Sequence, residues 1–361
     1  MSKIDPKSSK PTNNQSKVTP FRGKTKTINL ALQGGGSHGA FSWGVLDKLL
    51  EDERIEIDAL SGTSAGAMNA VVFANGLALG GRDGARAALH KFWSAVNQAA
   101  KFSPLARTPF DILCGSWNLD YSPGFLFFDM LSRIASPYEL NPLNINPLRE
   151  ILLQQIDFER LRNFDQIKLF ISATHVQSGR IKIFEQKSLC ADRVMASACV
   201  PFVFQAVEID GESYWDGAFM GNPPLFPFIN RSESRDIVIV QVNPMERDSA
   251  PRTARDILER MNEITFNASL AKEFRAIDFV TRLLDDGSLD ESRYKRLYIH
   301  IISAEREMAP LNVSSKLNAE WSFLQHLKAL GRDAATSWLE RNFSGLGERS
   351  TVELRPLYQG E

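Results

Sequence analysis

The sequence predicts a protein of the α/β class, in which helices cover a mostly parallel central sheet. Short apolar runs typical of buried strands alternate with segments of helical spacing between Ile28 and Leu79. The chain has 361 residues and 43% of them are hydrophobic, so it can bury the substantial core that such a fold needs.

The first four predicted elements follow one another closely. Ile28–Gln33 (INLALQ) predicts a buried strand, and a run of glycines separates it from a helix over His38–Glu51. Ile57–Ser61 predicts a second strand, and Ala65–Leu79 predicts a helix without charged residues. Strand, helix, strand and helix in direct succession favour parallel strands.

The later elements show the same patterns at wider spacing. The predicted strands are Lys168–Ala173, Arg180–Phe184, Phe202–Ile209, Ser213–Trp215, Asp236–Val242 and Leu297–Ser303. The predicted helices are Ala85–Ala100, Leu189–Ala198, Ala254–Leu284 and one or two within Ser314–Asn342. The Asp210–Gly211 pair predicts a hairpin turn between its flanking strands.

The segment 102–148 differs from the rest of the chain in composition. It is rich in phenylalanine, asparagine and proline, and its six prolines rule out a long uninterrupted helix. Two interpretations stay open: an apolar lid or substrate-contacting insertion, and a packed irregular segment without such a role.

The ends and charges of the chain suggest a location. Residues 1–26 are polar and basic without the apolar core of a signal peptide, so we expect a disordered leader. Residues 59–81 are uncharged over the length of a bilayer helix, but their glycines and asparagines favour a buried strand, turn and helix. We therefore expect a soluble cytoplasmic protein, with peripheral membrane contact left open.

Charge and cysteine content exclude some partners and cofactors. The 42 basic and 43 acidic residues balance, which gives no general attraction to nucleic acid or to an anionic membrane. The three cysteines have no disulfide or zinc-binding spacing, and no acidic or histidine cluster suggests a metal. We expect no cofactor.

The glycine run after the first strand has two possible roles. Gly34 to Gly39 fits G-x-G-x-x-G, a dinucleotide fingerprint, yet the second strand ends in Ser61–Ser64 and lacks the acidic residue that would hold a ribose. Glycine amides at a helix N-terminus stabilise an oxyanion as readily as a phosphate. A plain tight turn is the simplest alternative.

A second motif contains a candidate nucleophile. Gly62-Thr63-Ser64-Ala65-Gly66 is G-x-S-x-G between a predicted strand and a predicted helix, the setting of a nucleophile elbow. A triad of Ser64, Asp216 and His300 has the chain order of an esterase. However, His300 lies in the middle of an apolar strand, where a histidine is more often part of the core.

Four motifs in order, namely GGGSHG, GTSAG, ASACVP (residues 196–201) and DGA (residues 216–218), resemble those of the patatin-like phospholipase family. The resemblance implies a three-layer α/β/α patatin-like fold with C-terminal helices, and a Ser–Asp dyad with Ser64 as nucleophile and Asp216 as base. It also implies that Gly34, Gly35, Gly36 and Gly39 form an oxyanion hole. The motif positions around the dyad are then Gly62, Gly66, Gly217 and Ala218.

The resemblance divides the chain into three parts. Residues 27–230 correspond to the catalytic domain, after the leader 1–26, and residues 231–361 are expected to add core strands and helices. His38 departs from the family, which usually has Arg or Lys there, and a histidine at a helix N-terminus is expected to be neutral. Asp210 is a second Asp-Gly that an ordinary hairpin explains.

The expected function is that of a serine acyl hydrolase of the lipase or phospholipase A type. Its substrate would be a lipid ester, cleaved through an acyl-enzyme. Partial burial should raise the pKa of Asp216 enough for it to act as a base. The alternatives are a catalytically silent lipid- or partner-binding module on the same scaffold, and a nucleotide-binding protein.

Overall fold

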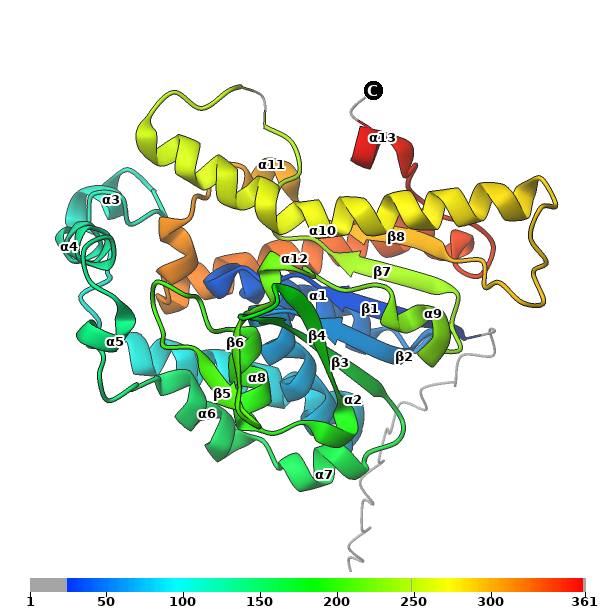
Figure 1. Cartoon of the computed structure of the whole chain (residues 1–361), viewed down its shortest axis with the longest axis horizontal. Coiled ribbons are helices and arrows are strands. Elements are labelled where there is room, and N and C mark those ends of the chain that lie inside the picture. The colour runs from blue at the N-terminus through cyan, green and yellow to red at the C-terminus, as the bar shows by residue number, and fades with distance from the viewer. Residues whose placement is uncertain (1–24, 248, 360–361) are drawn as a thin grey trace, which may run out of the picture.

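The computed structural model describes residues 25–247 and 249–359, so the predicted leader lies almost entirely outside the described residues. These residues form one eight-stranded sheet in the order β5-β6-β3-β2-β1-β7-β8, with β4 paired to β3 (Figure 1). The strands are β1 (Lys26–Leu32), β2 (Ile55–Gly62), β3 (Lys168–His175), β4 (Arg180–Glu185), β5 (Val207–Ile209), β6 (Glu212–Asp216), β7 (Asp236–Val240) and β8 (Tyr298–Ile302).

The sheet is mostly parallel, as predicted for this fold class. Pairs β3–β2, β2–β1, β1–β7 and β7–β8 are parallel, whereas β4, β5 and β6 form antiparallel pairs at one end. The strands β7 and β8, which come from the part after residue 231, lie beside β1 in this sheet. Parallel strands end at a common edge, and here it is the edge that carries the glycine loop and Ser64.

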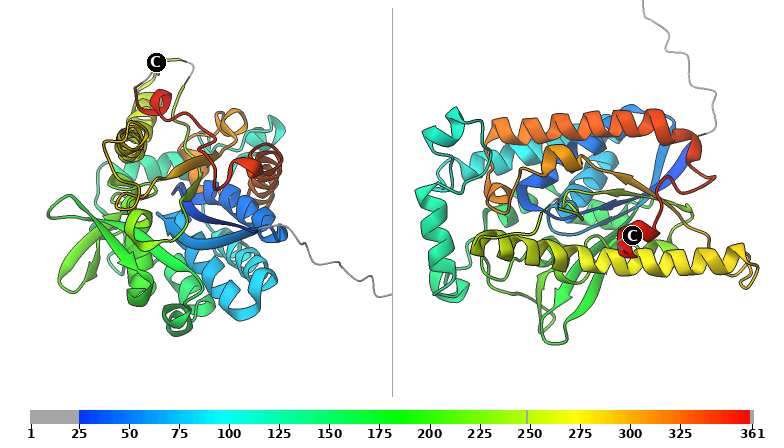
Figure 2. Two further views of the ribbon diagram at one scale, coloured as in Figure 1. Left: turned by 90° about the vertical axis from the view of Figure 1, so that its right-hand side faces the viewer. Right: turned by 90° about the horizontal axis from the view of Figure 1, so that it is seen from above.

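Two apolar clusters fill the two sides of the sheet. Leu30 and Leu32 of β1 pack with α1 (Gly39–Glu51), whereas Ala31 between them belongs to the cluster with α10 (Ala254–Asp285). This alternation follows from the two-residue repeat of a strand. Figure 2 shows α12 (Trp321–Asn342) and α10 on opposite sides of the sheet.

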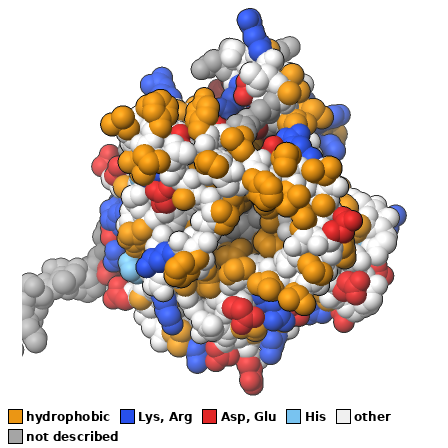
Figure 3. All heavy atoms as spheres, turned by 90° about the vertical axis from the view of Figure 1, so that its left-hand side faces the viewer, with side chains coloured by type: hydrophobic (Ala, Val, Ile, Leu, Met, Phe, Trp, Pro, Cys, Tyr) orange, Lys and Arg blue, Asp and Glu red, His pale blue; other side chains and the backbone are white. Residues whose placement is uncertain are grey.

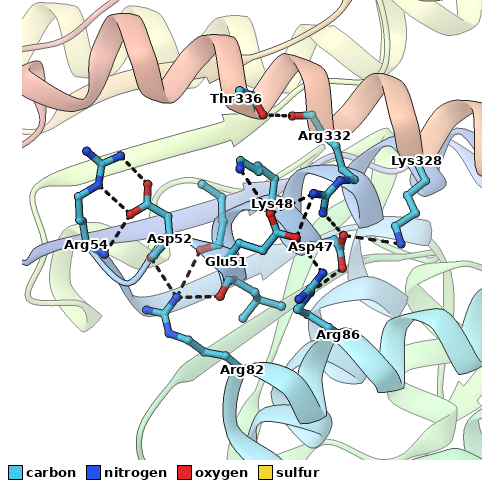
Figure 4. Close-up of polar contacts among 12 residues, drawn as sticks. Asp47, Lys48, Glu51, Asp52, Arg54, Arg82, Arg86, Lys328, Arg332 and Thr336 are labelled. Carbon is cyan, nitrogen blue, oxygen red and sulfur yellow. Dashed lines mark hydrogen bonds and ion pairs between the residues drawn. The ribbon is translucent and has the colours of Figure 1, made fainter. Parts of the chain in front are cut away.

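The C-terminal helix α12 packs tightly on α1. A Cβ at Gly44 would lie 2.0 Å from the carbonyl oxygen of Lys328, and one at Gly331 would lie 2.0 Å from that of Phe41, so the two backbones are in direct contact. Asp47 of α1 strengthens this contact, because it pairs with cations from both α2 and α12 (Figure 4). These cations are Arg86, Lys328 and Arg332.

The two helices predicted over residues 65–100 are present within α2 (Ala65–Ala100), where Gly80 and Gly81, whose backbone angles are not helical, separate them. Its uncharged first half is buried, as expected. No helix in the described part of the chain has the length and apolarity to cross a bilayer.

One prediction of local structure needs correction, and another is confirmed in more detail. The strand predicted from Phe202 begins at Val207, because residues 201–204 form turns. The prolines of residues 102–148 do not only interrupt helices, because four of them begin one. Proline is tolerated at the first helical position, where the backbone amide has no hydrogen-bond partner within the helix. These helices are α3 (Pro109–Leu113), α4 (Pro123–Ser132), α5 (Pro137–Leu140) and α6 (Pro147–Gln155).

The other helical elements are short. They are α7 (Phe158–Asn163), α8 (Ala191–Ser197), α9 (Pro227–Arg231), α11 (Glu305–Met308) and α13 (Arg355–Gln359), with 3-10 turns η1 (Gly36–His38), η2 (Gln186–Ser188), η3 (Gly217–Phe219), η4 (Ser314–Leu317) and η5 (Phe343–Gly345).

Candidate active site

Ser64 lies at the sharp turn between β2 and α2, with φ 53° and ψ −121°. A residue with a side chain is strained at positive φ, and such strain is typical of a nucleophile elbow. The turn requires Gly66, because a Cβ there would lie 2.1 Å from the carbonyl oxygen of Leu32. Ser64 is partly exposed at the carboxyl edge of the sheet.

Asp216 lies close to Ser64 because β2 and β6 pair with the same side of β3, one after the other along its length. Gly62 at the end of β2 pairs with Ile171, and Asp216 at the end of β6 pairs with Ala173, two residues further along. β4 occupies the opposite edge of β3. Asp216 therefore lies just beyond the end of β2, close enough to Ser64 for the Ser64 side chain to lower the pKa of its carboxyl group.

The ASACVP segment fixes both residues. The Ser64 amide donates a hydrogen bond of 2.9 Å to the Ser197 hydroxyl. The Asp216 amide donates one of 2.8 Å to the carbonyl oxygen of Cys199. Because Ser197 and Cys199 lie two residues apart at the buried C-terminal end of α8, this segment sets the position of Ser64 relative to Asp216.

The carboxyl group of Asp216 is buried, and burial raises its pKa to about 6. Three interactions oppose this shift: a 2.8 Å hydrogen bond from the Ala218 amide, the polar interaction with the Ser64 side chain and the positive charge of Lys316. A carboxyl group with a pKa near 6 is mostly ionised at pH 7 and is still basic enough to accept a proton.

The amides of the glycine loop are of two kinds: some donate hydrogen bonds within the protein, and others have no acceptor. The amide of Gly34 donates to the Asn222 side chain at 2.7 Å, and the amide of Gly39 donates within the turn to the carbonyl of Gly36. The amides of Gly35 and Gly36 have no acceptor among the described residues, and Gly36 is exposed. Of the four glycines expected to form an oxyanion hole, Gly35 and Gly36 therefore remain as the candidate amide donors.

The loop lies against the elbow itself. A Cβ at Gly34 would lie 2.7 Å from the Cβ of Ser64. The glycine loop therefore lies directly beside Ser64.

Lys316 of η4 is a residue near the loop that the sequence did not indicate. Its carbonyl oxygen would lie 2.4 Å from a Cβ at Gly36, whose φ of +57° favours glycine. Its ammonium donates to Asn243 Oδ1 at 2.8 Å, and the Asn243 amide donates to the Gly34 carbonyl at 2.8 Å. Burial lowers the pKa of Lys316 to about 8, and the charge of Arg247 also lowers it, against opposing effects of Glu263, Glu259 and Asp216.

His38 is neutral, as expected, but mainly for a different reason. Its pKa is far below the usual value because the ring is buried and because Lys316 is nearby. The ring lies 2.8 Å from the Ser315 hydroxyl and packs edge-on against Phe323. The cation near the loop is therefore Lys316, contributed by a segment far along the chain.

The residues considered as alternatives lie elsewhere. His300 is fully buried in β8 and hydrogen-bonds to Asp236 and Thr351, both at 2.9 Å, so it is placed as a core histidine. Asp210 lies in the hairpin turn, is exposed and pairs with Arg193 at 3.2 Å. Neither contributes to the arrangement around Ser64.

Within residues 25–247 and 249–359, no group of three or more histidine, cysteine, aspartate or glutamate side chains is arranged to hold a metal ion. The supporting residues missed from the sequence are Ser197, Asn222, Asn243 and Lys316. Only Ser197 had a signal, since it lies in one of the four motifs.

Comparisons with known proteins support one family. The sequence model described as "Patatin-like phospholipase" matches residues 30–229, more than half of the chain. No curated protein matches the chain.

Some solved structures are similar in part. VipD from Legionella pneumophila is 17% identical with a TM-score of 0.35, and the alignment covers 84% of this chain and 66% of that chain. The ExoU–SpcU complex from the type III secretion system of Pseudomonas aeruginosa gives 18% identity and a TM-score of 0.31, with 92% and 65% covered. This chain thus spans slightly less than two thirds of the length of these structures.

Proposed function

The chain belongs to the patatin-like phospholipase family, and we propose that it is a serine acyl hydrolase that cleaves carboxylic esters of lipids. The observation that carries the proposal is the pairing of Ser64, strained at a strand–helix turn, with the buried carboxylate of Asp216. A hydroxyl next to a group that can accept its proton is the minimum for nucleophilic catalysis.

The acylation step uses both residues and the glycine loop. Asp216 takes the proton of Ser64 as Oγ attacks the ester carbonyl, and the negative oxygen accepts hydrogen bonds from the amides of Gly35 and Gly36. The carbon–oxygen bond to the alcohol then breaks, and protonated Asp216 returns the proton to the leaving oxygen. The product is an acyl-enzyme on Ser64.

Deacylation repeats the sequence with water. Asp216 takes a proton from water as its oxygen attacks the acyl carbonyl, and the same loop amides stabilise the second oxyanion. When the bond to Ser64 Oγ breaks, Asp216 returns the proton to the serine. A fatty acid leaves, and the enzyme is restored.

Lys316 is proposed as a positioning residue for this chemistry. Its carbonyl packs on Gly36 and its ammonium is linked through Asn243 to Gly34, so it fixes the loop from the outside. Its charge also favours the ionised form of Asp216, which is the form that accepts a proton. Neutral His38 supplies no such charge.

The test uses the full chain, a fluorophosphonate probe that reacts with activated serines, and a panel of lipid esters. We expect the wild type to be labelled and to hydrolyse esters, and Ser64→Ala to lose both while it keeps its thermal unfolding temperature. Lipid binding without any labelling or hydrolysis would instead favour the catalytically silent binding module. Saturable binding of NAD or ATP would favour the nucleotide site.

A further inference from the structure

Residues 102–145 expose an unusual amount of apolar surface. They contribute 13 of the 26 large hydrophobic side chains that are exposed in the described part of the chain. Phe102, Leu113 and Leu143 are 97%, 85% and 80% exposed. A monomer rarely leaves so many large apolar side chains uncovered in one region unless the region binds something.

Two other segments extend this surface. The loop after α8 exposes Val200 and Phe202, and hydrogen bonds join it to α5, from Gln205 to the carbonyl of Asn141 and from the Ala206 amide to Tyr138. The first turns of α10 expose apolar side chains on the same side of the molecule as α3 and α4 (Figures 1 and 2).

We call the combined set the apolar rim. It consists of the exposed apolar side chains of residues 102–145, of Val200, Phe202 and Met220, and of Ile257, Leu258, Met261 and Ile264.

The apolar rim lies on the side of the molecule that also carries the candidate site. Figure 3 shows this side of the molecule, with apolar side chains gathered around a central hollow. The carboxyl ends of the parallel strands point to the same side, and Ser64 and Asp216 lie at these ends. A large partner that settles on the rim therefore faces the mouth of the site.

The charged side chains within residues 102–148 all pair or hydrogen-bond with groups of the protein itself. Arg107 forms a bidentate pair with Glu320, and Asp129 pairs with Arg133. The remaining acidic side chains accept hydrogen bonds from nearby groups of the protein, and they are Asp111, Asp120 and Glu139. The segment holds no lysine. Such a surface attracts apolar material and offers no cationic patch to an anionic one.

From the position and apolarity of the rim, and from the charges of its largest part, residues 102–145, we infer that the protein docks on a zwitterionic or uncharged lipid surface, with the apolar rim inserted among the lipids. The inference rests on the proposed function, because a lipid surface is the one partner that would both cover the rim and deliver an ester to Ser64. A protein seated on the rim would cover the hollow and block that delivery.

The experiment measures binding apart from catalysis, in the Ser64→Ala background, by co-sedimentation with phosphatidylcholine vesicles. We expect binding that neither rises when phosphatidylserine is included nor falls at high salt. The triple variant Leu113→Asp, Ile134→Asp and Leu143→Asp should reduce the bound fraction about tenfold or more, because charged groups replace inserted apolar ones.

A matched control variant carries aspartate at Leu79, Phe279 and Tyr294, which are also exposed but lie on other parts of the surface. It should bind vesicles as the parent does. In the Ser64-containing chain, the rim variant should keep its rate on a short water-soluble ester while its rate on vesicle lipid falls. Loss of both rates would mean damage to the site itself.

Three results would overturn the inference. The first is no co-sedimentation of the parent with any vesicle, and the second is binding that requires phosphatidylserine. The third is a dimer in gel filtration that the rim variant disrupts while vesicle binding is unchanged, since the rim would then cover a second copy. If the wild type fails to hydrolyse the soluble ester, the proposed function is contradicted. The vesicle-binding results still test the docking inference on their own.

Discussion

The edge of the sheet at Ser64 and the apolar rim on the same side of the molecule are built in opposite ways. At the edge, Ser197, Cys199 and Asn222 each hold a backbone group of the motif residues by a hydrogen bond of 2.7 to 2.9 Å. On the rim, large apolar side chains are exposed on the surface. The difference indicates that position is fixed where the proposed chemistry occurs, and that surface is exposed where substrate would arrive.

The strongest test of the fixed edge is Asp216→Asn. The amide is nearly isosteric but cannot accept the serine proton, so we expect kcat/KM to fall on the order of 10³-fold or more. Asp210→Asn is the matched control, because Asp210 lies in the exposed hairpin turn, and it should leave the rate nearly unchanged. Similar losses in both variants would contradict the assignment of the base.

A smaller effect is expected when the loop backbone is shifted. In Gly36→Ala the new Cβ would collide with the carbonyl of Lys316, so the amide should move and kcat should fall about 10²-fold. Gly179→Ala has a similar φ of +63° but open space around it, so it should show comparable backbone strain with normal kcat. Steady-state kinetics and thermal unfolding of the two variants separate strain from collision.

These variants also show what the sequence could and could not reveal. The strand–turn–helix at Ser64 is local, so G-x-S-x-G between apolar runs was enough to predict it. The contacts of Lys316 and Asn243 join segments more than 200 residues away from the loop, and no local pattern marks them. Composition singled out residues 102–148, but only the fold shows that their apolar side chains face outward.

The pH dependence sharpens the comparison further, because the titrating groups lie at the edge and not on the rim. Asp216 must be ionised to act, so with its pKa near 6 activity should drop about fivefold between pH 6 and pH 5 and level off above pH 7. Lys316 loses its charge above its pKa of about 8, so a decline is expected at higher pH. The profile of kcat/KM on a soluble ester should be bell-shaped.

A second, partly buried acid titrates in the same range and needs its own control. Burial raises the pKa of Glu273 to about 7, and it accepts hydrogen bonds from the amide of Leu225. If the Glu273→Gln variant keeps the acid limb of the profile near pH 6, that limb belongs to Asp216. Disappearance of the limb in this variant would assign it to Glu273.

The smallest expected effect is that of Lys316→Met. We expect a several-fold loss of kcat, an acid limb shifted to higher pH because Asp216 loses a favourable charge, and no alkaline decline. Lys328→Met, which removes a lysine that pairs with Asp47 on α1, should leave the profile as it is. An unchanged pH profile for Lys316→Met would mean that the charge of Lys316 has no role and that the residue contributes only packing.

The pairing of β2 and β6 with the same side of β3 has a consequence for the order of events in folding. Since β2 and β6 are joined only through β3, the reactive pair is assembled by contacts between segments that are far apart in the chain, and such contacts form late. A slip of β6 by a single position would turn the carboxylate to the wrong face of the sheet. The appearance of esterase activity during refolding would therefore report correct strand register more sensitively than helix content.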